Sequence, residues 1–397
     1  MTTRGSRAFG WLAGIGLFIA VVGSAAAQPA TSAWPLFHGN QQRTGRTTIL
    51  GPAAATNVRV AVEGHGSFRS SPVIGPDGTV YAASGRRLCA IDPMTDTEKW
   101  CNNIDATVVF ASPALGVDPQ NPGQVLIYQG DRGGRMNAVD QNGMTRWSFQ
   151  IGVDGDVATS AMLNAAGNVF FGGSVRMFSM TPAGTLNWFQ GLDGVVFTAN
   201  PVLSPSGNTV YVGTISGTLY SFTPTGTQNW QVSVGRNIRF GAMAVAPDGT
   251  IYVGTRDGLT SVTDNGMSAT VNWTFPMSGR GVVSTPAIGL DGTIYVGGQG
   301  TASGGGGAFY AIKPDNSGVN FVYQTGKFFR GSPVIDGAGR VYTTSGRDVL
   351  AFDSTNPGNP FLWGYTTRRN LYSSPVLDAD GTLWIAGADR NLYAISD

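Results

Sequence analysis

The sequence contains few of the residues from which metal centres and catalytic pairs are usually built. Among 397 residues there are 2 His and 2 Cys, and charged residues make up 12%. His38 and His65 do not stand in a spacing typical of a metal site or a base–nucleophile pair, so both are expected to be loop histidines. The formal net charge of +1 gives no basis for nucleic-acid binding. We therefore predict no catalytic residue, no metal ligand and no nucleic-acid partner.

Long apolar runs are also lacking, except at the N-terminus. Two arginines precede an apolar run from Phe9 to about Val22, and residues 23–27 end in an Ala-x-Ala pattern. This pattern predicts a signal peptide over residues 1–27, with a retained membrane anchor as the alternative. No Cys follows the run, so a lipid anchor is not expected. We expect a periplasmic or secreted protein without a transmembrane segment after cleavage.

The two cysteines, Cys89 and Cys101, lie twelve positions apart in one predicted hairpin. In an exported protein such a pair can form a disulfide. Two free thiols in the core fit the sequence nearly as well, so both states remain open.

What the sequence does have is one phrase repeated eight times. The phrase begins Ser-Pro-Val-Ile at Ser71, and it is followed by a glycine turn and a β-branched segment. The position of Pro72 recurs at intervals of 40 to 48 residues, at Pro113, Ala161, Pro201, Met243, Pro286, Pro333 and Pro375. A period just above 40 that is filled with short apolar segments is typical of a propeller blade. Helical spacing of apolar residues is missing, so helix is expected to be almost absent.

Each repeat predicts a four-stranded antiparallel sheet. In the fourth unit, apolar segments at 201–203, 209–213, 219–222 and 229–232 are separated by turns rich in Gly, Ser and Pro. A large ring recurs where the outer strand begins, at Trp100, Trp147, Trp188, Trp230, Trp273, Phe321 and Trp363. We expect each of these rings to pack against the neighbouring blade.

The eighth repeat reaches Asp397 after only three strands, so its fourth strand must come from elsewhere. Residues 57–62 alternate in the required way and stand just before the first inner strand. Their pairing with the last blade would close the ring and remove two exposed sheet edges. We predict an all-β fold, an eight-bladed β-propeller that forms a single domain over residues 28–397.

These repeats resemble the PQQ-like β-propeller family, whose quinoprotein dehydrogenases and BamB-like scaffolds share the fold. The segment Ala90-Ile91-Asp92-Pro93-Met94-Thr95, ending on Trp100, is similar to the outer-strand motif Ala-x-Asp-x-x-Thr-Gly-x-x-x-Trp, and shorter matches begin at Ala138 and Ala351. The lead-in from Trp34 to Gly45 resembles that of exported members. The dehydrogenases in this family hold a quinone over calcium with carboxylates, often beside adjacent cysteines. Here glutamates are few and the cysteines are separated, so we expect no cofactor, and a quinone is the alternative.

Charges sort unevenly onto the two faces of the predicted ring. The loops that lead into inner strands lie on the same face as the loops that join second and third strands, and this face collects sixteen basic and nine acidic residues. The basic half of this face is predicted to bind an anionic group through Arg69, Arg236, Arg239, Arg280, Lys327, Arg330, Arg368 and Arg369. The alternative is a solvated rim with internal pairs such as Arg256–Asp257 and Arg347–Asp348. Nearby rings, including Phe68, Phe329 and Tyr372, are expected to pack the inner strands.

Together these features favour a monomeric, exported, non-catalytic binding or scaffold propeller. The expected partner is an envelope or extracellular protein, or an anionic small molecule or glycan, bound through the Arg-rich face. The alternative is a quinone-dependent oxidoreductase or a glycan-active enzyme on the same fold.

Overall fold

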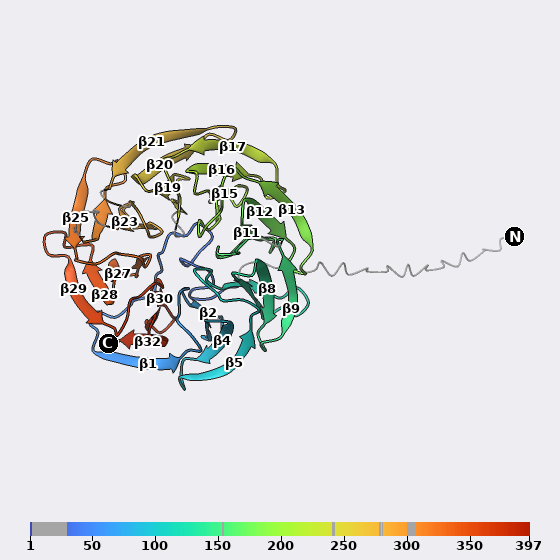
Figure 1. The fold of residues 1–397 in the computed structure, drawn as a ribbon, viewed down its shortest axis with the longest axis horizontal. Helices are drawn as coiled ribbons and strands as arrows, with labels where there is room; N and C mark the ends of the chain where they lie inside the picture. The colour runs from blue at the N-terminus through green and yellow to red at the C-terminus, as the bar shows by residue number, and fades with distance from the viewer. Residues whose placement is uncertain (2–29, 153–154, 240–242, 278, 280, 300–305) are drawn as a thin grey trace.

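The computed structural model is an eight-bladed ring (Figure 1). It describes residues 1, 30–152, 155–239, 243–277, 279, 281–299 and 306–397. The predicted signal peptide, residues 1–27, therefore lies outside the described residues except for Met1. Eight four-stranded antiparallel sheets form the described part, and no helix occurs in it, as predicted. None of the described segments is a helix that could span a membrane.

The strands follow one another in blade order, and each blade runs from the axis outward. Blades 1 to 4 are β2 (Val73–Ile74), β3 (Val80–Ser84), β4 (Arg87–Asp92), β5 (Thr97–Asn103); β6 (Ala114–Val117), β7 (Val125–Gly130), β8 (Arg135–Asp140), β9 (Thr145–Gln150); β10 (Met162–Leu163), β11 (Val169–Gly173), β12 (Arg176–Met180), β13 (Leu186–Gly191); β14 (Val202–Leu203), β15 (Val210–Gly213), β16 (Thr218–Phe222) and β17 (Gln228–Ser233). Blades 5 to 8 are β18 (Met243–Val245), β19 (Ile251–Gly254), β20 (Gly258–Asp264), β21 (Ala269–Pro276); β22 (Ala287–Ile288), β23 (Ile294–Gly297), β24 (Ala308–Ile312), β25 (Val319–Gln324); β26 (Val334–Ile335), β27 (Arg340–Ser345), β28 (Asp348–Asp353), β29 (Phe361–Thr366); and β30 (Val376–Leu377), β31 (Leu383–Ala386), β32 (Asn391–Ser396) with β1 (Asn57–Glu63).

The ring closes where the sequence predicted. Strand β1 pairs antiparallel with β32, from Asn57 opposite Ser396 to Glu63 opposite Asn391. On β1, Arg59 occupies the position at which the outer strands of the other blades carry a large aromatic ring. The Arg59 guanidinium donates to Asp96 at 2.7 Å and to the Pro93 carbonyl at 3.0 Å, which attaches the last blade to the first.

The other blade junctions are built on the predicted tryptophans and on Phe321. Trp100 donates its indole N–H to the carbonyl of Gln141 in the next blade at 2.7 Å. The ring covers Gly143, where a Cβ atom would approach it to 2.7 Å and where φ is +85°, so only glycine fits this turn. Trp147 and Trp188 repeat the arrangement one blade further on, with Gly184 and Gly226. The prediction that these rings pack between blades is confirmed.

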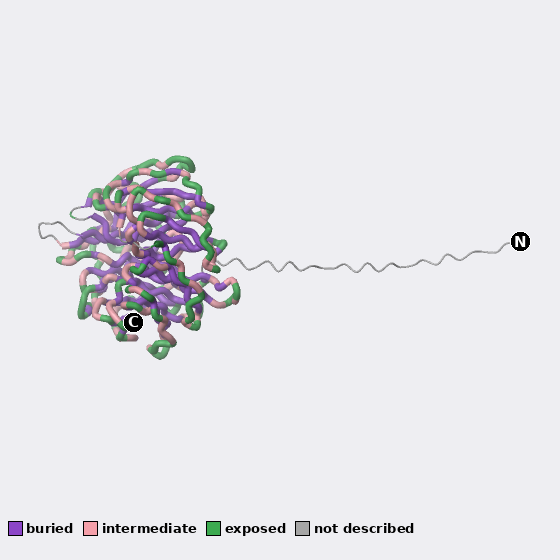
Figure 2. The backbone as a smooth tube through the Cα atoms, turned by 45° about the vertical axis from the view of Figure 1, so that its right-hand side comes forward, coloured by how far each residue is buried: buried purple, intermediate pink, exposed green. Residues whose placement is uncertain are grey.

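Burial follows the blades closely, with buried backbone inside each sheet and exposed turns at the rims (Figure 2). The inner three strands of each blade are almost wholly buried, while the outer strands alternate between exposed and half-buried residues. The core is therefore a set of interfaces between neighbouring sheets, and it surrounds a central channel.

A chain of hydrogen bonds links the inner strands around this channel. In six of the eight blades, the residue that precedes the repeated Pro position accepts, through its side-chain oxygen, the backbone N–H of the equivalent residue in the preceding blade. These contacts measure 2.6 to 2.9 Å and run from Ser71 to Ser112, Ser112 to Ser160, Ser160 to Asn200, Thr285 to Ser332, Ser332 to Ser374 and Ser374 to Ser71. The equivalent residue of the fifth blade, Ala242, lies outside the described residues.

The N-terminal lead-in, residues 30–54, seals one end of the channel. It winds through the centre of the ring in Figure 1, as the blue trace. Inner-strand N–H groups donate to its carbonyls at 2.7 to 3.0 Å, in the pairs Ile74–Trp34, Leu115–Pro35, Leu203–Gln41, Val245–Gln42, Ile288–Thr44 and Ile335–Gly45. Short inner strands have an unpaired edge toward the axis, and the lead-in supplies the acceptors that this edge needs.

Two buried side chains fix the lead-in in place. Arg43 is fully buried and donates to the carbonyls of Phe37, Ser160 and Pro201. His38, which was expected in a loop, lies in a segment without regular structure but is 1% exposed. Its ring nitrogens lie 2.5 Å from the Arg43 carbonyl and 2.7 Å from the Pro333 carbonyl.

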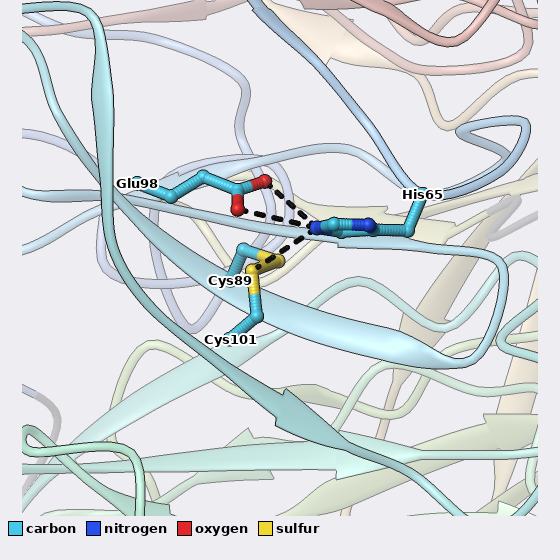
Figure 3. A group of neighbouring side chains, drawn as sticks. All are labelled: His65, Cys89, Glu98 and Cys101. Carbon is cyan, nitrogen blue, oxygen red and sulfur yellow. Dashed lines mark hydrogen bonds and ion pairs between the residues drawn. A yellow bond between two sulfur atoms is a disulfide. The ribbon is translucent and has the colours of Figure 1, made fainter.

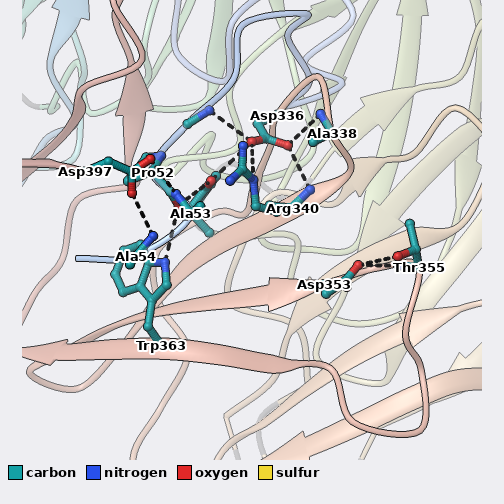
Figure 4. A network of polar contacts seen from close by, with 12 residues as sticks. Pro52, Ala53, Ala54, Asp336, Ala338, Arg340, Asp353, Thr355, Trp363 and Asp397 are labelled. Carbon is teal, nitrogen blue, oxygen red and sulfur yellow. Dashed lines mark hydrogen bonds and ion pairs between the residues drawn. The ribbon is translucent and has the colours of Figure 1, made fainter. Parts of the chain in front are cut away.

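Before it reaches β1, the lead-in pairs with blade 7 through Thr47–Ile335 and Ile49–Gly337 backbone hydrogen bonds, and a polar network continues this contact (Figure 4). Asp336 accepts the backbone N–H of Gly51 at 2.9 Å and the guanidinium of Arg340 at 2.8 Å. The side chain of Asp397 accepts the backbone N–H groups of Ala53 and Ala54. The last residue of the chain thereby holds the segment that leads into the closing strand.

The hairpin of β4 and β5 carries the two cysteines directly opposite each other. Cys89 and Cys101 are register partners, and they form a disulfide. Of the two states that the sequence left open, the structure has the disulfide.

We predict that Arg43→Met lowers the free energy of unfolding by about 2 to 4 kcal/mol, because three buried carbonyls lose their charged donor. Urea denaturation of the purified protein measures this change. Arg256→Met, at an exposed arginine, is the control and should change the free energy by less than about 0.5 kcal/mol. Equal stability of the two variants would contradict the role of Arg43.

The stability should also fall in mild acid because of His38. Burial lowers the pKa of His38 to about 4, and the two facing carbonyls oppose this shift. In the unfolded chain the pKa is about 6.5. Above that pH both states are neutral and stability is complete; as the pH falls toward 4, only the unfolded state gains the proton. The expected loss is about 3 kcal/mol, measured by urea unfolding at several pH values. His38→Gln should flatten this dependence, and an unchanged slope would contradict the assignment.

Candidate functional site

The open end of the central channel forms a pocket on the predicted basic face. Its floor is Phe37 from the lead-in, and its wall is the hydrogen-bonded ring of Ser71, Ser112, Asn200, Ser332 and Ser374. Its rim comes from the loops that lead into the inner strands, and it includes Arg69, Phe110, Thr198, Arg330 and Tyr372. The fold therefore makes a cup with a neutral polar wall and a basic rim.

Two arginines and one tyrosine make up one side of the rim. The guanidinium carbon of Arg330 lies 5.2 Å from the centre of the Tyr372 ring, and that of Arg69 lies 5.6 Å from the same ring. Arg330 also lies 5.9 Å from the ring of Phe328. Stacking on a ring holds a guanidinium in place while leaving its N–H groups free to bind an anion.

The neighbouring hollows extend the basic rim on both sides of this pair. Arg239 lies 5.8 Å from the ring centre of Phe197 and shares a hollow with Arg256 and Arg330. On the other side, Arg347, Arg368 and Arg369 line a hollow together with Arg69 and Tyr372. The predicted residues Arg69, Arg239, Arg330, Arg368 and Arg369 are thus brought to one half of the face.

Of the three other residues predicted to bind an anion, two already pair with carboxylates and one is not described. Arg236 donates to Asp257 at 2.8 Å, and its hydrogen bonds lower the pKa of that carboxyl group. Lys327 donates to Asp348 at 2.8 Å. Arg280 lies outside the described residues. The pairs named in the alternative interpretation, Arg256–Asp257 and Arg347–Asp348, are not formed. Each of these aspartates instead pairs with a basic residue from the loop that leads into the same blade.

The eight acids of this face that the structure describes are all engaged within the chain, and the ninth, Asp154, lies outside the described residues. Ion pairs join Glu63 to Arg390, Asp105 to Arg135, Asp156 to Arg132, Asp257 to Arg236 and Asp348 to Lys327. Asp131, Asp193 and Asp389 accept hydrogen bonds from nearby backbone, threonine or tyrosine groups. Of the described carboxylates, none lies within 4.0 Å of the guanidinium groups of Arg69, Arg239, Arg330, Arg347, Arg368 or Arg369. An uncompensated cationic half-face remains.

Sequence reasoning missed two parts of this site. Phe68 and Phe329 are buried core residues, as predicted, but Tyr372 lines the pocket and orders two arginines. The wall of Ser and Asn residues was also missed. Its signal was present, since each of these residues stands immediately before the repeated Pro position.

The pocket does not fit the calcium-assisted quinone site that the family resemblance implies for dehydrogenases. Calcium binds six to eight oxygen ligands that include carboxylates. Among the described lining residues there is no carboxylate, and two guanidinium groups stand at the rim. The cysteines form a disulfide on an outer hairpin instead of lining the axis.

Comparison with known sequences identifies a family relationship. The model of the family described as outer membrane protein assembly factor BamB matches residues 42–181 and 171–397. No curated protein sequence matches the chain.

Several solved structures share the architecture at low sequence identity. BamB from Moraxella catarrhalis is 16% identical with a TM-score of 0.66, over 87% of this chain and 99% of that one. Quinohemoprotein alcohol dehydrogenase from Comamonas testosteroni is 14% identical with a TM-score of 0.68, over 89% and 76%. The C-terminal WD40 domain of Sif2 is 11% identical with a TM-score of 0.67, over 88% and 99%. At these identities the likeness concerns the fold.

Proposed function

The chain belongs to the family described as outer membrane protein assembly factor BamB, and we propose that it is an exported binding propeller that holds an acidic segment of an envelope protein. The segment would lie across the basic half-face, with a carboxylate over the axial pocket. In this proposal the protein acts by holding its partner and carries out no reaction.

The observation that carries the proposal is the imbalance on this face. The described acids there form ion pairs or hydrogen bonds within the chain, whereas six arginines around the pocket have no carboxylate within 4.0 Å among the described residues. Clustered unpaired guanidinium groups repel one another, so an anionic partner relieves a cost that the free protein bears. Arginine also favours carboxylates because it can donate two parallel hydrogen bonds.

The shape of the face favours an extended segment over a small compact ligand. The hollows that contain Arg239, Arg330, Arg69 and Arg369 share lining residues and follow one another around the rim. A chain with several carboxylates can reach more than one hollow, whereas a single small anion fills only one. A glycan or small anion is therefore the second candidate, and a quinone is disfavoured by the lining of the pocket.

We predict that Arg69→Glu/Arg330→Glu weakens binding of poly-L-glutamate by about 100-fold, because it replaces attraction with repulsion at the centre of the site. Binding is measured by fluorescence anisotropy at low and at high salt. Wild-type affinity should fall steeply as salt rises. The matched control is Lys99→Glu/Lys313→Glu, which makes the same change of charge on the opposite face and should retain most of the affinity.

A crosslinking pull-down from the native envelope fraction extends this test to the natural partner. A protein captured at low salt by the wild type and by the control, but not by the double variant, would support the proposal. Equal capture by all three proteins, or equal affinity for poly-L-glutamate, would contradict it.

A further inference from the structure

Four side chains with metal-binding atoms meet where the ring closes (Figure 3). His65 stands in the segment that leads from β1 to the first inner strand, and Cys89, Glu98 and Cys101 belong to β4 and β5. Their ligand atoms all lie within 4.8 Å of one another. His65 was predicted to be a loop histidine without a metal role, because its distance in sequence from the cysteines hides this contact.

The imidazole is aimed at the other three groups. Nε2 of His65 lies 3.1 Å from Oε1 of Glu98 and 3.6 Å from Sγ of Cys101. One guanidinium nitrogen of Arg87 lies 3.3 Å from Nδ1 and 3.4 Å from Nε2. The arrangement places one nitrogen, one carboxylate and two sulfurs around a common point.

We propose that the dithiol form of this cluster is a zinc site, and that the disulfide keeps the site closed. Two thiolates, an imidazole and a carboxylate form a donor set that Zn²⁺ accepts in tetrahedral geometry. In the disulfide the sulfurs are bonded to each other and have no thiolate charge to offer. The proposal is independent of the binding role of the basic face.

The steps balance with a protein dithiol as the reductant. The dithiol gives two electrons and two protons to the Cys89–Cys101 bond and itself becomes a disulfide, which leaves two thiols on this chain. Binding of Zn²⁺ then releases both thiol protons to solvent, and the neutral imidazole that binds through Nε2 carries its one proton on Nδ1. The site would have a net charge of −1, and the guanidinium of Arg87 lies beside it.

The surroundings suit a site that exchanges with solvent. The side chains of His65 and Glu98 are 35% and 30% exposed, so an ion and a reductant can reach them, while Cys89 is buried beneath. His65 comes from the link out of the closing strand and the other ligands come from blade 1. Bound zinc would therefore cross-link the two sides of the ring closure when the disulfide is open.

The test titrates the reduced, metal-free, full-length protein with Co²⁺, which reports tetrahedral thiolate ligation by its visible and charge-transfer absorption, and then displaces it with Zn²⁺. We expect one equivalent to bind to the reduced protein and none to the oxidised protein. His65→Ala and Glu98→Gln should each weaken zinc binding at least about tenfold in competition with a chelator, while both thiols remain reactive. Glu63→Gln, two residues from His65 and outside the cluster, is the control and should leave zinc affinity unchanged.

If reduction disturbs the fold, circular dichroism of the reduced protein with and without Zn²⁺ replaces the titration as the test. Recovery of the native spectrum on addition of Zn²⁺ would support the site. The proposal is overturned if the reduced protein takes up no more cobalt than Cys89→Ser/Cys101→Ser. It is equally overturned if zinc affinity survives both His65→Ala and Glu98→Gln, or if zinc fails to restore a fold lost on reduction.

Discussion

The inner edge of every blade has to find hydrogen-bond partners, and much of this structure is a response to that need. Inner strands of two to four residues face the axis, where no further strand pairs with them. Buried backbone groups without partners are costly. The lead-in supplies carbonyls to six inner strands, and the Ser and Asn side chains connect one blade to the next. Because the lead-in fills one end of the channel, the other end becomes a pocket.

Because the inner strands need hydrogen-bond partners, the residues that close the propeller also form the pocket. Phe37 of the lead-in forms the floor of the pocket, and Arg43 lies 5.2 Å from its ring while binding three carbonyls. The wall residues of the pocket are also the residues that join the inner strands. The rim is separate from these contacts, because its arginines stand on loops that do not take part in them. Chemistry at the rim can therefore change while the scaffold stays constant.

The sequence predicts the repeated part of the molecule well, because a blade is local. Its turns, its strands and the outer tryptophans recur within about 40 residues, and the missing eighth outer strand points to residues 57–62. Features that join distant segments are different. Asp257 and Asp348 pair with Arg236 and Lys327 and not with their sequence neighbours. His65, in the link between β1 and β2, contacts Cys101 on β5. The burial of His38 and Arg43 depends on a segment outside the repeats, so periodicity says nothing about it.

Segments near the start of the sequence can form their contacts only with segments near its end. The lead-in is synthesised before the repeats, yet His38 contacts Pro333 across 295 residues, and β1 pairs with β32, the last strand. Contacts of such long range slow folding, since the loop must close before any energy is gained. A nascent chain therefore holds unsatisfied edges until its final residues emerge. Closure of the ring is then the last event of folding, because it requires the lead-in and the last blade together.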